Sequence, residues 1–256
     1  MKAIRASFGF LTVLPVAPRT GAGLGSARAF FPLVGLTLGG LLAGFDRFAG
    51  GALGTELSSA LIVVGLLALT RMLHMDGLMD SCDALLGGYS RERRLEILKD
   101  PRVGVFGAIG GMSVLLLKWT AIITLAGPVR LPMIVLFPLL GRWSAAFVMQ
   151  IFPYGRKSGV GSSLLENRGV WQPLVAAVMA IAASLLIAGP LGVLLLGGVT
   201  IVASLLGVWM AKLLGGLTGD GYGAVVEITE TAALIAAVAL YNTWPGLLDG
   251  RFGIPG

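Results

Sequence analysis

Charged residues are scarce in this chain of 256 residues. Only 12% of them are Asp, Glu, Lys or Arg, whereas a soluble domain usually carries about 25%. The hydrophobic share is 56% and the mean hydropathy is +0.89. An ordinary soluble domain is thereby excluded, and so is a disordered chain, because disorder requires low hydrophobicity. The apolar residues stand in long runs, which predict an all-α, polytopic helical membrane protein.

Cysteine and histidine are nearly absent. Cys82 is the only cysteine, so an internal disulfide bond is excluded. It stands inside an acidic cluster, either as a small packing residue or as a metal ligand. His74 is the only histidine and does not by itself make a metal site, although it stands two residues before Asp76. Glycine is abundant instead, with 39 residues, which suits closely packed membrane helices.

The net charge is +6 and the isoelectric point is near 9.9. In a soluble protein such a charge can indicate a nucleic-acid partner. Here the cations gather in a few loops, and the positive-inside rule for membrane proteins explains that pattern more simply. We therefore expect no nucleic acid, and a lipid bilayer as the surroundings.

The hydropathy pattern predicts six to eight membrane spans, with seven preferred. Each is close to the ~20 residues that cross a bilayer. The seven spans are 29–46, 55–72, 104–126, 132–151, 171–188, 191–213 and 231–248. The pair around Gly189-Pro190 is either a tight hairpin or one broken helix. We expect a single integral-membrane catalytic domain, 1–256, whose N-terminal segment 1–28 is interfacial or re-entrant.

The distribution of arginine and lysine predicts the topology. With the N-terminus in the cytoplasm, nearly all cations in the loops fall on the cytoplasmic side. Only Arg47, Arg130 and Arg251 fall outside. Three polar segments then share the cytoplasmic face, namely 73–103, 152–170 and 214–230. Their convergence predicts one active site at the cytoplasmic surface of the membrane.

The first of these segments contains three aspartates. Asp76, Asp80 and Asp83 lie at i, i+4 and i+7, so a helix would place them on one face. Carboxylates this close repel one another unless a divalent cation neutralises them, and oxygen ligands suit Mg²⁺. Gly77 would leave room for a phosphate group or a neighbouring helix. The alternative is a solvated helix face without a metal.

A basic stretch follows the aspartates. Ser90 is placed to cap a surface helix that lies on the lipid headgroups. Pro101 should end that helix. Lys99, Asp100 and Arg102 then become candidates to face the active site.

The other two polar segments carry further candidates. Asp220 lies among glycines and Glu227 follows it, which indicates either a second half-site or a flexible connector. Arg156, Lys157 and Asn167 suit a phosphate or a nucleotide, or else form a loop that only sets topology.

Two cations, Lys118 and Arg142, fall within predicted spans. A charge inside the membrane is costly, so each calls for a function or a buried partner. Lys118 has a third option, because a long side chain can extend toward the membrane surface.

Several sequence blocks together resemble the cobalamin synthase, or adenosylcobinamide-GDP ribazoletransferase, family over nearly the whole chain. In chain order they are FLTVLPV, RAFFPLVGLTLGG, HMDGLMDSCDALLGGYSRERRLEILKDPRVGVFG, FPYGRKSG and LTGDGYGAVVEITE. Cys82 and Ala84 depart from the family pattern, which more often has a small residue before Asp-Gly.

The resemblance implies a Mg²⁺-dependent enzyme of the inner membrane that joins α-ribazole, or its 5′-phosphate, to the cobinamide phosphate of adenosylcobinamide-GDP. GMP would leave, and adenosylcobalamin or its 5′-phosphate would form. Phosphoryl transfer of this kind depends mostly on charge neutralisation and alignment. The hypothetical metal ligands are Asp76, Asp80 and Asp83. The hypothetical catalytic residues are His74, Asp80, Asp83, Lys99 and Asp100. The hypothetical substrate-binding residues are Gly77, Arg102, Arg142, Arg156, Lys157, Asn167, Asp220 and Glu227.

Two other functions compete with this one. A CDP-alcohol phosphatidyltransferase would show Asp-x₂-Asp-Gly-x₂-Ala-Arg and two later aspartates, but here the glycine follows the first aspartate and the later pair is missing. An ion-coupled transporter would favour carboxylates at mid-membrane and a repeat of the two halves. The predicted positions put the acids at one face, and the halves show no repeat. The sequence is compatible with a monomer or a homo-oligomer.

Overall fold

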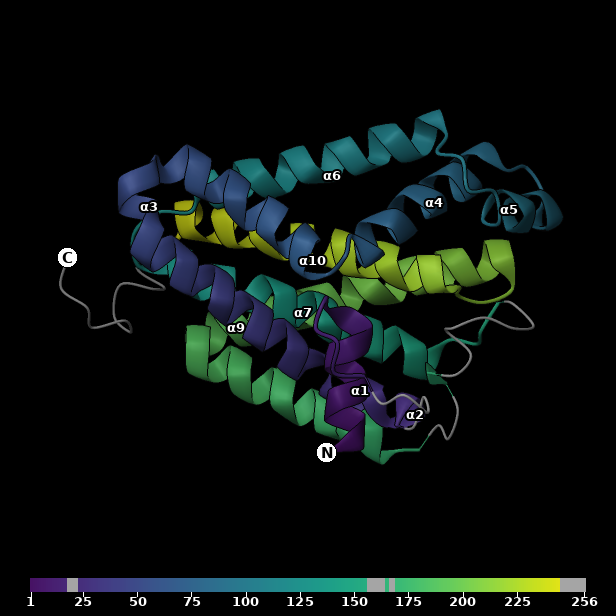
Figure 1. Ribbon diagram of the computed structural model, residues 1–256, viewed down its shortest axis with the longest axis horizontal. Helices are drawn as coiled ribbons and strands as arrows, with labels where there is room; N and C mark the ends of the chain where they lie inside the picture. The colour runs from purple at the N-terminus through teal and green to yellow at the C-terminus, as the bar shows by residue number, and fades with distance from the viewer. Residues whose placement is uncertain (18–22, 156–163, 166–168, 245–256) are drawn as a thin grey trace.

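The computed structural model describes residues 1–17, 23–155, 164–165 and 169–244. These residues form helices, and the only β-pairing among them is an isolated bridge between Tyr154 and Leu217. The predicted all-α class is therefore confirmed (Figure 1). The elements are α1 (Lys2–Leu11), α2 (Leu24–Ala27), η1 (Arg28–Phe30), α3 (Phe31–Leu69), α4 (Leu73–Gly87), α5 (Arg91–Ile97), α6 (Val105–Thr124), η2 (Gly127–Val129), α7 (Arg130–Ile151), α9 (Trp171–Leu214) and α10 (Gly219–Thr243).

Five helical stretches in the described part of the chain are long and apolar enough to cross a membrane. Those that contain α3 and α9 have 46 and 44 residues, about twice the length that one crossing needs. The helical membrane fold is thus as predicted. Both long helices fold back on themselves, so each of their arms matches one predicted span.

Helix α3 turns at Gly54, whose φ of 77° and ψ of 161° are not helical. A Cβ atom added to Gly65 would lie 3.4 Å from the Leu42 side chain, so the two arms are packed against each other. Figure 1 shows the arms meeting at the end of the molecule labelled α3. Arg130, at the start of α7, clamps this turn through two hydrogen bonds of 2.8 Å to the Asp46 carboxylate.

Helix α9 turns at Gly189, with φ of 58°, immediately before Pro190. Residues eight apart in a straight helix are separated by about 12 Å. Here Gly192 approaches the carbonyl group of Ser184 so closely that an added Cβ atom would collide with it. Of the two alternatives for Gly189-Pro190, the hairpin is therefore confirmed.

The last helix begins earlier than the sequence predicted. We expected a polar loop at 214–230 and a span at 231–248, but α10 already starts at Gly219. The Thr218 hydroxyl group caps it by accepting a 3.1 Å hydrogen bond from the Gly221 N–H. The glycine-rich stretch is helical because small residues allow this turn to pack closely against α4. Glu227 and the nearby Glu230 consequently lie inside a buried helix and not at a loop edge.

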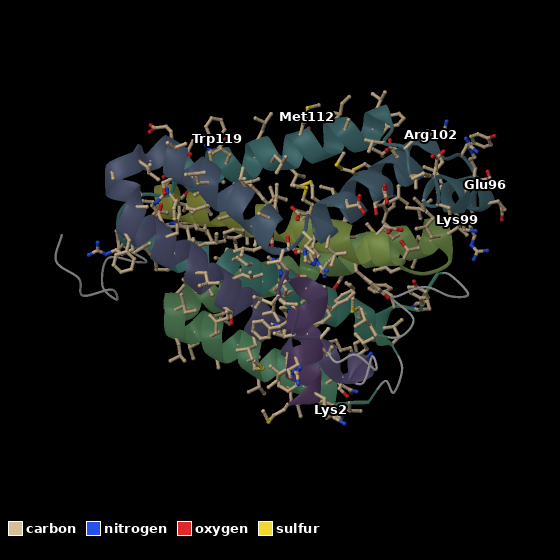
Figure 2. All side chains as sticks on the ribbon, in the orientation of Figure 1. Lys2, Glu96, Lys99, Arg102, Met112 and Trp119 are labelled. Atoms are coloured by element: carbon tan, nitrogen blue, oxygen red, sulfur yellow. The ribbon has the colours of Figure 1, made fainter. Side chains whose placement is uncertain are left out.

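Most of α7 is buried at the centre of the bundle, between α3, α9 and α10. Helix α6 is mostly exposed, and its outer face carries apolar side chains such as Met112 and Trp119 (Figure 2). An apolar outer face of this kind suits contact with lipid tails.

Candidate active site

A cavity of about 280 Å³ lies where the first turns of α4 and α10 meet. All three predicted polar segments contribute to its wall, and α1 closes it from a fourth direction. The sequence therefore predicted their convergence correctly. The lining residues are Phe10, Leu11, Phe31, Leu73, His74, Asp76, Gly77, Ala145, Met149, Tyr154, Leu164, Gly219, Asp220, Tyr222, Gly223 and Val226.

Hydrogen bonds to backbone carbonyl groups join the segments around the cavity. The Gly155 N–H donates to the Leu217 carbonyl group at 2.8 Å, and the Leu217 N–H donates to the Pro153 carbonyl group at 2.9 Å. The Arg91 guanidinium donates to the Leu214 carbonyl group at the end of α9, at 2.8 Å. Segment 73–103 is thus tied to segment 214–230, which in turn pairs with the start of segment 152–170.

A tight turn brings α4 to the cavity. Arg71 and Met72 have φ of 54° and 56°, a left-handed backbone conformation that residues other than glycine rarely adopt. The Arg71 guanidinium donates to the carbonyl groups of Gly9 and Phe10, at 3.3 and 3.4 Å. The same side chain therefore holds the turn and α1 together, and the first turn of α4 is directed into the cavity.

Helices α4 and α10 are in close contact at Gly77. A Cβ atom there would lie 2.8 Å from the Asp220 carbonyl oxygen and 2.9 Å from the Asp220 Cα. Asp76 and Asp220 consequently face the same cavity from two helices. The sequence predicted that Gly77 leaves room for a phosphate group or for a neighbouring helix, and in the structure the neighbouring helix α10 approaches it.

The three aspartates of α4 do not share one environment. Asp76 lines the cavity, and Asp80 lies one turn further along α4. The Asp83 carboxylate instead accepts hydrogen bonds from the N–H groups of Gly104 and Gly107, at 2.7 and 2.8 Å. Both of its oxygens are thus used at the start of α6, where a negative charge is favourable. Asp83 holds α4 against α6, which differs from the predicted metal and catalytic roles.

The described ranges contain no group of three His, Cys, Asp or Glu side chains close enough to hold a metal ion together. Mg²⁺ commonly takes one or two carboxylates and fills its other positions with water and substrate phosphate oxygens. Carboxylates at the cavity edge fit that smaller requirement. Cys82 does not, because burial and the Asp83 charge raise the pKa of its thiol. Cys82 packs against Gly110, in agreement with the predicted alternative of a small packing residue.

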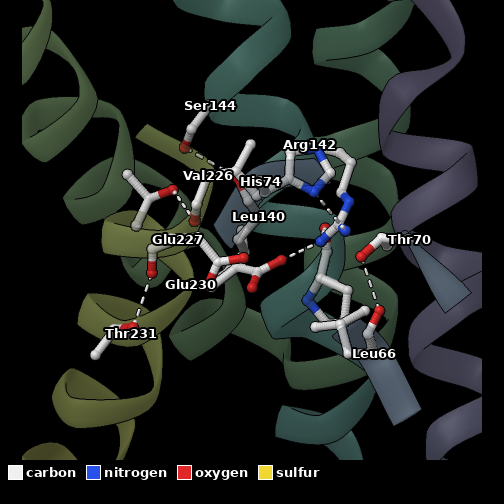
Figure 3. A network of polar contacts seen from close by, with 12 residues as sticks. Leu66, Thr70, His74, Leu140, Arg142, Ser144, Val226, Glu227, Glu230 and Thr231 are labelled. Atoms are coloured by element: carbon white, nitrogen blue, oxygen red, sulfur yellow. Dashed lines mark hydrogen bonds and ion pairs between the residues drawn. The ribbon is translucent and has the colours of Figure 1, made fainter. Parts of the chain in front are cut away.

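His74, Arg142 and Glu227 belong to a buried network of charges that also includes Lys118 and Glu230 (Figure 3). Lys118 donates to Glu227 at 2.5 Å and also binds Glu230, which in turn pairs with Arg142. Both cations thus have buried partners, and Lys118, only 3% exposed, does not extend to the surface.

The network meets the cavity only through His74. The Arg142 guanidinium lies 3.4 Å from His74 Nδ1, and neither Arg142 nor Glu227 lines the cavity. They lie outside the lining of the cavity, and their predicted substrate-binding role stays a prediction. Burial, together with the charges of Arg142 and Lys118, lowers the pKa of His74 well below its usual value. A neutral imidazole that accepts a hydrogen bond from Arg142 fits this position.

The basic loop after α5 lies apart from the cavity. Ser90 caps α5 as predicted, by accepting a 3.2 Å hydrogen bond from the Arg93 N–H. Lys99 and Arg102 are exposed at the end of the molecule that α5 occupies (Figure 2). The Arg102 side chain, by hydrogen bonding to Asp100, lowers the pKa of that carboxyl group to about 2. Asp100 therefore stays ionised and paired, and the structure does not bring these three residues to the cavity.

Three other predicted residues, Arg156, Lys157 and Asn167, lie outside the described residues.

Sequence reasoning missed the aromatic wall of the cavity. Phe10 and Phe31 stack with their ring centroids 6.2 Å apart, and Tyr154 and Tyr222 stack at 6.5 Å. All four rings line the cavity. The position of Tyr154 and Tyr222 inside polar segments of a membrane protein could have indicated that they line the site. The two phenylalanines stand in apolar runs, where nothing distinguishes them from other core residues.

The fold and this cavity define a class: an integral-membrane helical protein with carboxylates at the edge of an aromatic-lined site. A family model described as cobalamin-5-phosphate synthase matches residues 3–238. The chain belongs to the cobalamin-5-phosphate synthase family.

Proteins named adenosylcobinamide-GDP ribazoletransferase are similar to it along nearly their whole length. The relative from Roseiflexus sp. (strain RS-1) is 39% identical over 228 residues, which cover 88% of this chain and 85% of the relative. The relative from Chlorobium phaeovibrioides is 38% identical over 242 residues, which cover 91% and 96%. The relative from Pseudomonas fluorescens is 39% identical over 246 residues, with the same coverage. No solved structure matches the chain.

Proposed function

We propose that this protein transfers the adenosylcobinamide phosphate group of adenosylcobinamide-GDP to α-ribazole or its 5′-phosphate, and releases GMP. Family membership and the names of the relatives support the reaction class. The observation that carries the proposal in the structure is the cavity at which Asp76 of α4 and Asp220 of α10 meet. The positive-inside pattern supports placing this cavity at the cytoplasmic face of the inner membrane.

The reaction exchanges one phosphorus–oxygen bond for another. A ribazole hydroxyl oxygen attacks the phosphorus that is attached to cobinamide, and the bond from this phosphorus to the bridging oxygen breaks. The electron pair leaves with GMP, and the hydroxyl proton passes to a carboxylate. We assign that carboxylate to Asp220, because it lines the cavity at the first turn of α10.

Asp76 and Asp80, one turn apart on α4, are the residues that would hold Mg²⁺. The ion would supply charge neutralisation at the diphosphate. Their position on one helix fixes the spacing of the two carboxylates. The buried contact at Gly77 fixes that helix against Asp220. This arrangement aligns the two reacting groups, which is the main requirement of phosphoryl transfer.

The buried carboxylates of α10 do not favour a transporter. Glu227 and Glu230 lie inside a membrane-length helix, where a transporter could use them. Each is paired with a buried cation, so the network is balanced in charge and closed by its own contacts. Removing one partner of such a pair is costly, and with the pairs intact neither carboxylate is available to bind a transported ion.

An assay of the purified protein tests the proposal. With adenosylcobinamide-GDP, α-ribazole and Mg²⁺ together, we expect GMP release and formation of the joined corrinoid. Omission of either organic substrate, or chelation of Mg²⁺, should abolish it. GMP release that is independent of α-ribazole would refute the transfer. Ion flux into liposomes without any turnover would favour the transporter.

A further inference from the structure

The cavity wall combines two kinds of side chain. Asp76 and Asp220 bring carboxylates to it from the first turns of α4 and α10. The stacked pairs Phe10–Phe31 and Tyr154–Tyr222 supply flat apolar surface, and the rings within each pair lie 13° and 26° from parallel. A molecule that fills this space must therefore combine a flat apolar part with a polar part.

The size of the cavity limits which substrate it can enclose. Its volume of about 280 Å³ is slightly below the ~300 Å³ at which pockets for drug-sized ligands begin. It corresponds to the liquid volume of about nine water molecules. A two-ring base joined to one ribose is of this order. A corrin macrocycle with its adenosyl group and amide side chains is several times larger.

We propose that the cavity is the binding site for the acceptor nucleoside, with the flat base against the accessible rings of Phe10 and Tyr154, which Phe31 and Tyr222 support from behind, and with the ribose toward Asp220. The corrinoid ring stays outside the cavity, and only its diphosphate reaches Asp76. This inference rests on the proposed function, since it assigns one of that reaction's two substrates to the site.

Three observations carry the assignment. Aromatic rings bind flat heteroaromatic ligands by stacking, and two of the four rings here, Phe10 and Tyr154, are only half-buried and therefore accessible. The rings come from α1, α3, α10 and the segment after α7, so tertiary packing alone assembles them. The reacting hydroxyl group of a seated nucleoside would lie near Asp220, which the proposed mechanism requires.

Equilibrium binding of each substrate alone, to the full chain in detergent with Mg²⁺, tests the assignment without turnover. Phe10→Leu and Tyr154→Leu should each weaken α-ribazole binding by about 3- to 10-fold. Their affinity for adenosylcobinamide-GDP should stay within about twofold of wild type. Tyr154→Phe keeps the ring and should bind α-ribazole as wild type does. Phe147→Leu is the matched control, because this half-buried ring packs at a tilt against Trp143 and does not line the cavity.

A second measurement needs no variant. Photo-crosslinking of α-ribazole to the unmodified protein should label the peptides that contain Phe10 and Tyr154. Labelling elsewhere, or variants that lose affinity for the corrinoid and not for α-ribazole, would overturn the assignment. If the wild type releases GMP while the aromatic variants keep their α-ribazole affinity, the assignment fails and the proposed function stands. If the wild type binds α-ribazole at these rings without releasing GMP, the proposed function fails instead.

Discussion

At the scale of single residues, position in the fold gives different roles to side chains that look equivalent in the sequence. Asp76 and Asp83 belong to one acidic motif on one helix. Asp76 is open to the cavity, whereas both Asp83 oxygens are used by the backbone of α6. The same carboxylate group can thus serve chemistry in one place and helix packing in another.

Asp76→Asn and Asp83→Asn should therefore fail in different ways. Asp76→Asn should lower the rate by about 10²-fold or more and raise the Mg²⁺ concentration needed for half-maximal rate, because a metal ligand is lost. Asp83→Asn should lower the free energy of unfolding by about 1–3 kcal/mol, because one oxygen that accepts an N–H is replaced by a donor. Mg²⁺ titrations and thermal melts of both variants make the comparison. An unchanged Mg²⁺ requirement in Asp76→Asn would contradict its assignment.

Asp220→Asn tests the proton acceptor. The maximal rate should fall by about 10²-fold or more, since general base catalysis contributes that much. The Mg²⁺ requirement should stay unchanged, which distinguishes this residue from Asp76. Steady-state kinetics over a range of Mg²⁺ concentrations measures both quantities. Full activity of the variant would exclude Asp220 as the base.

At the scale of helices, glycine and buried charge decide how the elements pair. Gly77 and Gly223 let α4 and α10 approach until backbone atoms are in contact. Lys118 of α6 and Arg142 of α7 then bind the two glutamates of α10. The glycine contacts lie at the cavity wall, whereas the ion pairs hold α10 through residues that do not line the cavity.

Gly77→Ala should separate α4 from α10. The new Cβ atom would lie 2.8 Å from the Asp220 carbonyl oxygen, so the backbone must move. We expect a loss of about 1–3 kcal/mol in stability, together with reduced activity. Gly44→Ala, on α3, is the control, because no atom lies within 4 Å of its added Cβ. Thermal melts in detergent compare the two, and equal stability would show that the contact at Gly77 is not tight.

Lys118→Met should destabilise the bundle by about 3–5 kcal/mol, because it leaves the Glu227 charge buried without its partner. Combining it with Glu227→Gln removes that charge and keeps the Arg142–Glu230 pair. The double variant should recover a large part of the lost stability. Denaturation of the two single variants and the double variant measures the coupling, and strictly additive losses would contradict the network.

At the scale of the whole molecule, the charges of the loops predict its orientation in the membrane. Lys99 is exposed near the end of α5, and Phe48 is 90% exposed near the turn of α3. The sequence places the first on the cytoplasmic side and the second outside.

Labelling with a membrane-impermeant maleimide tests this orientation in a Cys82→Ala background, which removes the only native cysteine. Lys99→Cys should react in inverted membrane vesicles and not in intact cells. Phe48→Cys should react in intact cells. The opposite pattern would place the cavity on the outer face and remove the cytoplasmic substrates from its reach.

The sequence by itself determined the helical membrane class, because long apolar runs have no other stable arrangement in lipid. It also placed the arms of α3 and α9 as separate spans, although it left Gly189-Pro190 open between a hairpin and one broken helix. The convergence of three polar segments followed from charge placement alone. These properties depend on local composition, which a single sequence displays directly.

Only the tertiary structure decided which polar residues share a space. Periodicity put Asp83 beside Asp76 on one helix face, but the direction of a carboxylate depends on which backbone N–H groups lie nearby. Glu227 was expected at a loop edge, yet close packing of small residues extends α10 past it. The aromatic wall joins residues from four separate parts of the chain. No local pattern can reveal contacts of that kind, because they depend on how distant segments pack against one another.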